Sequence, residues 1–394
     1  MPARIVRRSA VVTGVAILIL CAIVAPAFAI TRAQVLTRAQ TWIDHPIPYG
    51  QASYYGGYRT DCSGYVSMSW KTSTPGYVTL TMHNISDPIA ASQLRPGDVL
   101  LKAGSHVRLF VGWADALRTT YVCYEQTPPH TKSSIRALAD DLDDDYIPYR
   151  YENITESDTT QPSTTTNAVA SYSVLAMIRL AASDNSHGSG VAHTYFRVDG
   201  GAIREGLAVN VRAPGGHTVE YWSVDRMCNE EHHKSATFSV TPAPAGTLPV
   251  FRFYDSANGS HFYTASGPEC DTVIAKLSST YSLDGIAYTI DTTNADNDDA
   301  LFRFYNKKNH SHFYTSSTDE RDSIIANLGA TYSYDGPAYS VDGTDTAGAA
   351  PVYRFYNFKH DTHFYTASEA EKNSVVAKLG YIYRFEGPAF YLAP

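Results

Sequence analysis

The segment Asp61-Cys62-Ser63-Gly64-Tyr65 places a cysteine just before a run that reads as a helix, Tyr65 to Trp70. A later β-type segment, His106 to Gly112, opens with a histidine. The N-terminus of a helix favours negative charge and therefore the thiolate form of a cysteine. A histidine can take the thiol proton and return it to a leaving group. The sequence therefore predicts a cysteine nucleophile at Cys62 with His106 as its base.

Three segments of this region, taken together, resemble motifs of the NlpC family of cell-wall cysteine peptidases. They are the Asp61–Val66 turn, the Arg-Pro-Gly-Asp turn within Leu94–Leu100, and the His106–Gly112 strand. Upstream, Pro48-Tyr49 and Tyr55-Gly56-Gly57 resemble two further family elements, with Tyr55 in place of Trp. The resemblance implies a papain-like α+β domain that cleaves peptide or amide bonds of bacterial cell walls. We expect no cofactor and no metal.

The same resemblance assigns roles to individual residues. Cys62 is the nucleophile, His106 the base, and a polar residue on the next strand orients the imidazole. In Tyr121–Thr127 that residue is Glu125, with Gln126 as the alternative. Neighbouring side chains of a strand point to opposite faces, so only one of the two can serve. The positions that we expect to contact substrate are Tyr49, Asp61, Ser63 and Gln126, and the Cys62 backbone N–H would hold the oxyanion.

The first 29 residues read as a secretory signal. Arg4, Arg7 and Arg8 precede an apolar run, Val11–Val24, and a small-x-small site, Ala27-Phe28-Ala29. The alternative is an uncleaved membrane anchor, for which the run is short. We expect a secreted protein that begins at Ile30.

Charge and cysteine usage exclude several classes of protein. Without the three signal arginines, the 31 basic residues fall to 28 against 39 acidic ones, a balance of −11. This argues against binding to nucleic acid or to anionic membranes. Four scattered cysteines remain after the signal, with neither zinc spacing nor the density of a disulfide scaffold. The acidic run Asp140–Asp145 lacks the spacing of a known calcium loop, so we interpret it as a solvated helix end or loop rather than a calcium site.

Composition divides the mature chain into three modules. The catalytic domain spans residues 30–154, and a Ser/Thr/Pro-rich linker follows at 155–167. Residues 168–241 alternate like β-strands and resemble the Ig-like modules of bacterial surface proteins, which implies a β-sandwich spacer. A second linker, 242–248, leads to residues 249–394. The expected fold class is thus multidomain, α+β followed by β.

The last module is an internal repeat with a period of 51 residues, in three copies at about 249–292, 300–343 and 351–394. Phe251-Arg252-Phe253-Tyr254 recurs as Phe302–Tyr305 and Tyr353–Tyr356. Each copy predicts two strands, a helix that starts with a capping box, and a closing strand. One copy is too small to bury a core, so the three should pack as one body.

In each copy an arginine, a histidine and a tyrosine could form a binding site for glycan, because tyrosine combines a flat apolar ring with a polar tip. The candidates are Arg252, His261 and Tyr263, then Arg303, His312 and Tyr314, then Arg354, His363 and Tyr365. The alternative is that they cement the repeat core, with each arginine paired to the recurring acid at Asp284, Asp335 or Glu386.

Together these features predict a secreted, monomeric peptidoglycan hydrolase that uses a Cys-His thiol mechanism and C-terminal repeats for targeting to a wall polymer. One alternative is a surface-binding or adhesion protein with a degenerate peptidase domain. Another is an amidase that cuts the bond between sugar and peptide.

Overall fold

The computed structural model describes residues 29–293, 299–342 and 348–393. Strands hold 48% of the described residues and helices 18%, which makes this a β-rich protein of several small sheets. Its internal contacts divide it into two units, one built on the chain up to Thr160 and the other on most of the rest. The predicted signal segment lies outside the described residues, apart from Ala29. Within the described ranges, no helix is long and apolar enough to cross a membrane.

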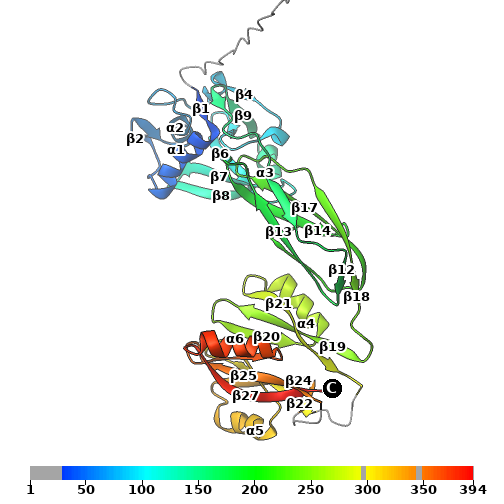
Figure 1. Cartoon of the computed structure of the whole chain (residues 1–394). Coiled ribbons are helices and arrows are strands. Elements are labelled where there is room, and N and C mark those ends of the chain that lie inside the picture. Colours follow the sequence, from blue (N-terminus) through cyan, green and yellow to red (C-terminus); the bar gives the residue numbers. More distant parts are fainter. Residues whose placement is uncertain (1–28, 294–298, 343–347, 394) are drawn as a thin grey trace, which may run out of the picture. The chain divides into compact units, whose positions relative to one another are not determined.

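The N-terminal unit is built on one antiparallel sheet with strand order β4-β9-β5-β6-β7-β8. Figure 1 labels β4, β9, β6, β7 and β8 of this sheet. Its strands are β4 (Ser86–Pro88), β5 (Val99–Lys102), β6 (His106–Trp113), β7 (Thr120–Thr127), β8 (His130–Ala137) and β9 (Ile147–Tyr151). The remaining elements are β1 (Ile30–Thr31), α1 (Arg32–Asp44), β2 (Gly50–Tyr55), β3 (Tyr58–Thr60), α2 (Cys62–Ser69), α3 (Leu138–Asp143) and β10 (Ile154–Thr155).

Helices α1 and α2 share a hydrophobic core with one face of this sheet. Val35, Ala39 and Trp42 lie four and three residues apart on α1, which places them on one buried stripe. They pack with α2 and with Val107 and Leu109 of β6. His106 has the opposite parity on β6, so it and Arg108 share the other face of the sheet. At the start of β6, neighbouring residues therefore face different sides: Val107 lies in the core with α2, and His106 lies on the other face of the sheet.

The middle of the chain forms two sheets around a common core, as the alternating pattern predicts. One sheet has the order β11-β13-β16 and the other β12-β18-β17-β14-β15, and apolar residues from both make up a single cluster. The strands are β11 (Ser163–Thr166), β12 (Ser171–Ser173), β13 (Ala176–Ser183), β14 (Val191–Val198), β15 (Arg204–Glu205), β16 (Ala208–Val211), β17 (Gly215–Asp225) and β18 (Lys234–Thr241).

The predicted linker at 155–167 is wrong in its second half. Ser163–Thr166 pairs with β13 as an antiparallel edge strand, and Thr164 is buried there. Threonine is β-branched and fits a half-buried sheet surface well, so a Ser/Thr-rich composition hid a strand.

The three repeats form one body, and each folds as two strands, a helix and a closing strand, as predicted. The elements are β19 (Thr247–Asp255), β20 (Ser260–Thr264), α4 (Gly267–Lys276) and β21 (Tyr281–Asp291); β22 (Asp299–Asn306), β23 (His312–Thr315), α5 (Thr318–Asn327) and β24 (Tyr332–Val341); and β25 (Ala350–Asn357), β26 (Thr362–Thr366), α6 (Glu369–Leu379) and β27 (Tyr383–Leu392). The three helices begin at the predicted serine caps, where each Ser side chain accepts the N–H of the Glu three residues on.

All three repeats contribute one face of their sheet to a shared central core. Val250, Leu301 and Val352 are equivalent positions in that core, and each is fully buried. The other face of each sheet lies under the helix of its own repeat. Because every repeat uses both of its faces, none could bury its apolar surface alone.

Candidate active site

Cys62 is the first residue of α2, and the turn before it is tightly built. Asp61 caps the helix: its carboxylate accepts the Gly64 N–H at 2.6 Å and the Ser63 hydroxyl at 2.9 Å. A Cβ at residue 64 would lie 2.0 Å from the Arg59 carbonyl oxygen, so glycine is required at this position. The Asp-Cys-Ser-Gly segment is thus a helix start that fixes the position of the thiol.

The backbone N–H of Val107 approaches the Cys62 sulfur as a hydrogen-bond donor, and the N–H groups of Ser63 and Cys62 at the helix start also lie close to it. Val107 follows His106 directly, so the hydrogen bond brings the thiol to the start of β6. Burial, and then the charge of Asp61, raise the pKa of the Cys62 thiol, outweighing these hydrogen bonds. The N–H groups at the helix start do lower the pKa, as expected, but burial has the larger effect. The thiol is protonated at rest and needs a base.

His106 is that base candidate, and a carboxylate holds its ring. The imidazole Nε2 lies 3.1 Å from Glu125 Oε2, and the side chain is 18% exposed, which leaves it within reach of solvent. A hydrogen bond through Nε2 leaves Nδ1 as the nitrogen that can exchange a proton with a thiol.

Of the two candidates on β7, Glu125 contacts the histidine and Gln126 faces the other way. Burial opposes the ionisation of Glu125, but hydrogen bonds from His106 and Ser134 and the charge of Arg108 together lower its pKa to about 2. Glu125 is therefore an anion at any working pH. The Gln126 amide donates to the carbonyl oxygens of Ile47 and Thr60, both at 3.0 Å. Gln126 thus ties down the segments that flank the β2–β3 hairpin.

Two of the predicted substrate contacts have structural partners instead. Asp61 is bonded within the helix cap and also pairs with Arg59 Nε at 2.9 Å. The Ser63 hydroxyl donates its hydrogen bond to Asp61. These bonds do not support a substrate-binding role for either residue. Tyr49 is half-buried at the entrance to β2, and its role stays a prediction.

Arg108, on the same face of β6 as the histidine, was not predicted from the sequence. Arg108 donates Nε to Glu125 Oε2 at 3.1 Å and Nη1 to Asp141 at 2.7 Å. Asp141, 1% exposed, also accepts from Arg136 at 3.1 Å and from the Tyr121 hydroxyl. The interpretation of Asp140–Asp145 as a solvated run is thus wrong at Asp141. The spacing of two residues between His106 and Arg108 was the available signal, because it puts both on one face of a strand.

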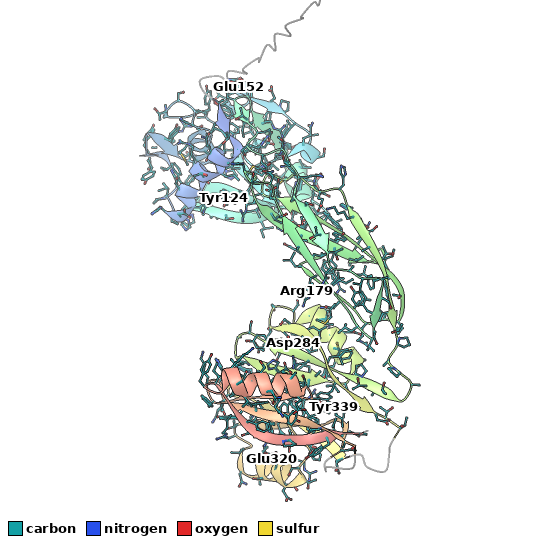
Figure 2. All side chains as sticks on the ribbon, viewed as in Figure 1. Tyr124, Glu152, Arg179, Asp284, Glu320 and Tyr339 are labelled. Carbon is teal, nitrogen blue, oxygen red and sulfur yellow. The ribbon has the colours of Figure 1, made fainter. Side chains whose placement is uncertain are left out.

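The candidate binding arginines of the repeats are paired with acids of their own repeat and of another repeat. Each arginine pairs with the recurring acid of its own repeat, Arg252 with Asp284 at 3.2 Å, Arg303 with Asp335 at 3.3 Å and Arg354 with Glu386 at 2.9 Å. Each also pairs with a helix glutamate of another repeat, Arg252 with Glu371, Arg303 with Glu269 and Arg354 with Glu320. Figure 2 labels Asp284 and Glu320, one acid of each kind, in the repeat body.

The three tyrosines lie at the centre of this body and are 1% exposed. The hydroxyl of Tyr263 donates to the carbonyl of Tyr365, that of Tyr365 to Tyr314, and that of Tyr314 to Tyr263, at 2.7 to 2.9 Å. Each hydroxyl also accepts a backbone N–H within the ring. A glycan cannot reach these buried side chains, so the predicted binding role of the tyrosines is wrong. The alternative, in which they stabilise the core of the repeats, holds for them.

The repeat histidines pack against phenylalanines of a neighbouring repeat. His261 lies on Phe364, with ring centroids 4.9 Å apart, and His312 lies on Phe262 and His363 on Phe313, both at 4.8 Å. Burial lowers the pKa of His261 to about 3 and of His312 and His363 to about 4. They are neutral packing groups between repeats, which again favours the structural alternative.

Comparison with known protein families finds one matching family, which covers the repeats and the last strands of the middle module. Residues 218–339 and 249–393 each match a domain of unknown function, DUF5648. The ends of the two matches differ by about one repeat, as expected for a family model that is itself repetitive. No curated protein and no solved structure matches the chain.

Proposed function

We propose that the N-terminal unit is a papain-like thiol hydrolase of the NlpC type, which cleaves an amide bond in the peptide part of bacterial cell wall. The observation that carries the proposal is the 3.1 Å hydrogen bond between His106 Nε2 and Glu125, next to a helix-start cysteine whose sulfur contacts the backbone of Val107. The three sequence motifs supply the wall peptide as substrate class.

The reaction follows from these positions. His106 takes the proton of the Cys62 thiol, and the sulfur attacks the carbonyl carbon of the scissile amide. Backbone N–H groups at the start of α2 stabilise the oxyanion. The imidazolium returns its proton to the leaving amine, and the acyl group stays on Cys62 as a thioester. Water, deprotonated by His106, then releases the acid and the free thiol.

Digestion of purified peptidoglycan by the full-length protein tests this proposal. We expect the wild type to release fragments with new amino and carboxyl ends inside the stem peptide, seen by mass spectrometry. Cys62→Ala should release none, whereas Cys270→Ala, a matched loss of a thiol in the repeats, should digest as the wild type does. Equal digestion by Cys62→Ala and wild type would contradict the proposal. Release of intact stem peptides would instead identify an amidase.

We also propose that the repeats bind wall polymer through exposed rings rather than through the buried tyrosines. Tyr254, Tyr334 and Phe385 of the repeat body are 36%, 42% and 44% exposed, and such rings can stack on sugars. Full-length Cys62→Ala protein should sediment with insoluble wall material, and Tyr334→Ala in that background should sediment less. Absence of sedimentation by the parent would remove the targeting proposal.

A further inference from the structure

The Glu125 carboxylate that holds His106 is shared with a cation. Arg108 Nε and His106 Nε2 both lie 3.1 Å from the same oxygen, Glu125 Oε2. The other oxygen, Oε1, accepts the Ser134 hydroxyl at 3.0 Å. Three donors, from His106, Arg108 and Ser134, therefore fix the carboxylate. The charged one, Arg108, binds the same oxygen as the imidazole.

Arg108 is itself held firmly. It is 8% exposed, its Nη1 lies 2.7 Å from Asp141, and its guanidinium lies 4.3 Å from the centre of the Tyr146 ring. Asp141 is bonded in turn by Tyr121 and Arg136. Glu125 and Asp141 carry two negative charges, and Arg108 and the partly exposed Arg136 carry two positive ones, so the four charges balance.

We propose that Arg108, anchored by Asp141, is a positioning residue that aims Glu125 at His106 and limits how strongly that carboxylate stabilises the imidazolium. A lone carboxylate at 3.1 Å would favour a charged imidazole, which cannot accept a proton. A cation on the same oxygen weakens that preference. This role rests on the proposed thiol chemistry, in which a protonated Cys62 needs a neutral base.

The other charged or titratable groups around His106 do not supply this balance. On β5, Lys102 is the register partner of His106, but its ammonium pairs with Asp144 at 2.7 Å. The Tyr146 ring meets the imidazole edge-on at 6.5 Å. On α2, the Cys62 thiol is uncharged at rest because burial raises its pKa. Arg108 is thus the cation that contacts the carboxylate holding His106.

The test is a direct titration of His106 in the full-length protein, followed by NMR of ¹³C-labelled histidine and assigned with His106→Gln. This readout does not need turnover, so it separates failure of this inference from failure of the hydrolase proposal. We expect Arg108→Gln to raise the pKa of His106 by about one unit. Arg108→Lys retains the charge, and its His106 should titrate within about 0.3 unit of wild type.

Asp141→Asn supplies a test of opposite sign. It removes an anion behind Arg108, so the pKa of His106 should stay the same or fall, while kcat falls because Arg108 loses its anchor. A role limited to folding would reduce activity in all three variants without this pattern of shifts. An unchanged titration in Arg108→Gln, or an equal rise in Arg108→Lys or Asp141→Asn, overturns the inference. Thermal unfolding identifies any variant that does not fold, and the remaining variants then decide.

Discussion

The N-terminal unit and the repeat body both place a histidine beside a carboxylate that also pairs with an arginine. In the first, His106 and Arg108 each lie 3.1 Å from Glu125 Oε2. In the third repeat, Arg354 lies 2.9 Å from Glu386 Oε2, but His363 lies 3.6 Å from it, beyond a normal hydrogen bond.

The two histidines differ in what lies on their other side. His363 packs on the Phe313 ring, and burial lowers its pKa to about 4. His106 adjoins Val107, whose N–H contacts the Cys62 sulfur. The same three residue types therefore serve packing in one region and, in our proposal, proton transfer in the other. In that proposal, the two histidines differ through the hydrogen bond to the carboxylate and the thiol near Val107, not through the residue types around them.

Replacement of the two histidines separates these roles with the largest effect. His106→Gln should lower kcat/KM on peptidoglycan by about 10³-fold or more, because the thiol loses its base. His363→Gln should leave kcat/KM unchanged, since it lies in another unit of the chain. Rates of fragment release at one pH measure both. Retention of more than about a tenth of the activity by His106→Gln would contradict the assigned base.

The hydrogen-bonded ring of Tyr263, Tyr314 and Tyr365 should contribute most to the stability of the repeat body. Tyr314→Phe removes a hydroxyl that donates to the Tyr263 carbonyl and accepts the Tyr263 N–H, both at 2.9 Å. Two buried backbone groups then lack partners, which should cost about 3 kcal/mol of unfolding free energy. Hydrogen exchange at residues 260–266 reports this loss. Tyr334→Phe, at an exposed ring, is the control and should change exchange by less than about 0.5 kcal/mol. Equal effects of the two would show that the ring is not the centre of stability.

Removal of the charge from each carboxylate sharpens the contrast further. Glu125→Gln retains the shape but cannot stabilise the imidazolium, so kcat/KM should fall by about 10²-fold. Glu386→Gln breaks the matching contact in the repeats and should leave kcat/KM as it is. Peptidoglycan digestion measures both variants, and an unaffected Glu125→Gln would remove Glu125 from the site.

The sequence predicted the parts of the molecule that local pattern encodes. The 51-residue period, the serine caps and the His106 strand follow from spacing, and the structure has them. What failed depends on contacts far apart in the chain. The Arg108–Asp141 pair spans 33 residues, and the tyrosine ring spans up to 102. A tyrosine that stacks on sugar and one that closes a core look alike in sequence, because burial is decided by the other two repeats.

The smallest predicted effect concerns acid stability of the repeats. The folded pKa of His261 is about 3, and those of His312 and His363 are about 4, all below the unfolded value of 6.5. Their contribution to stability is therefore fully present above pH 6.5 and is lost as pH falls towards the folded values. Each histidine adds a slope of at most about 1.4 kcal/mol per pH unit between pH 6 and pH 4.

A difference between two variants isolates this slope from the carboxylates. Burial raises the pKa of Asp284 and Asp335, which opposes the histidines at the acid end of the range. Those acids are present in His261→Gln as in the wild type, so their effects cancel when the two are compared. Hydrogen exchange in the repeats from pH 7 to pH 4.5 should show a shallower loss of stability in His261→Gln, by about 1 kcal/mol per pH unit. His106→Gln should retain the wild-type slope in the repeats. Parallel slopes in His261→Gln and wild type would mean that His261 is protonated in the folded repeats, and the two kinds of histidine would then no longer differ in charge.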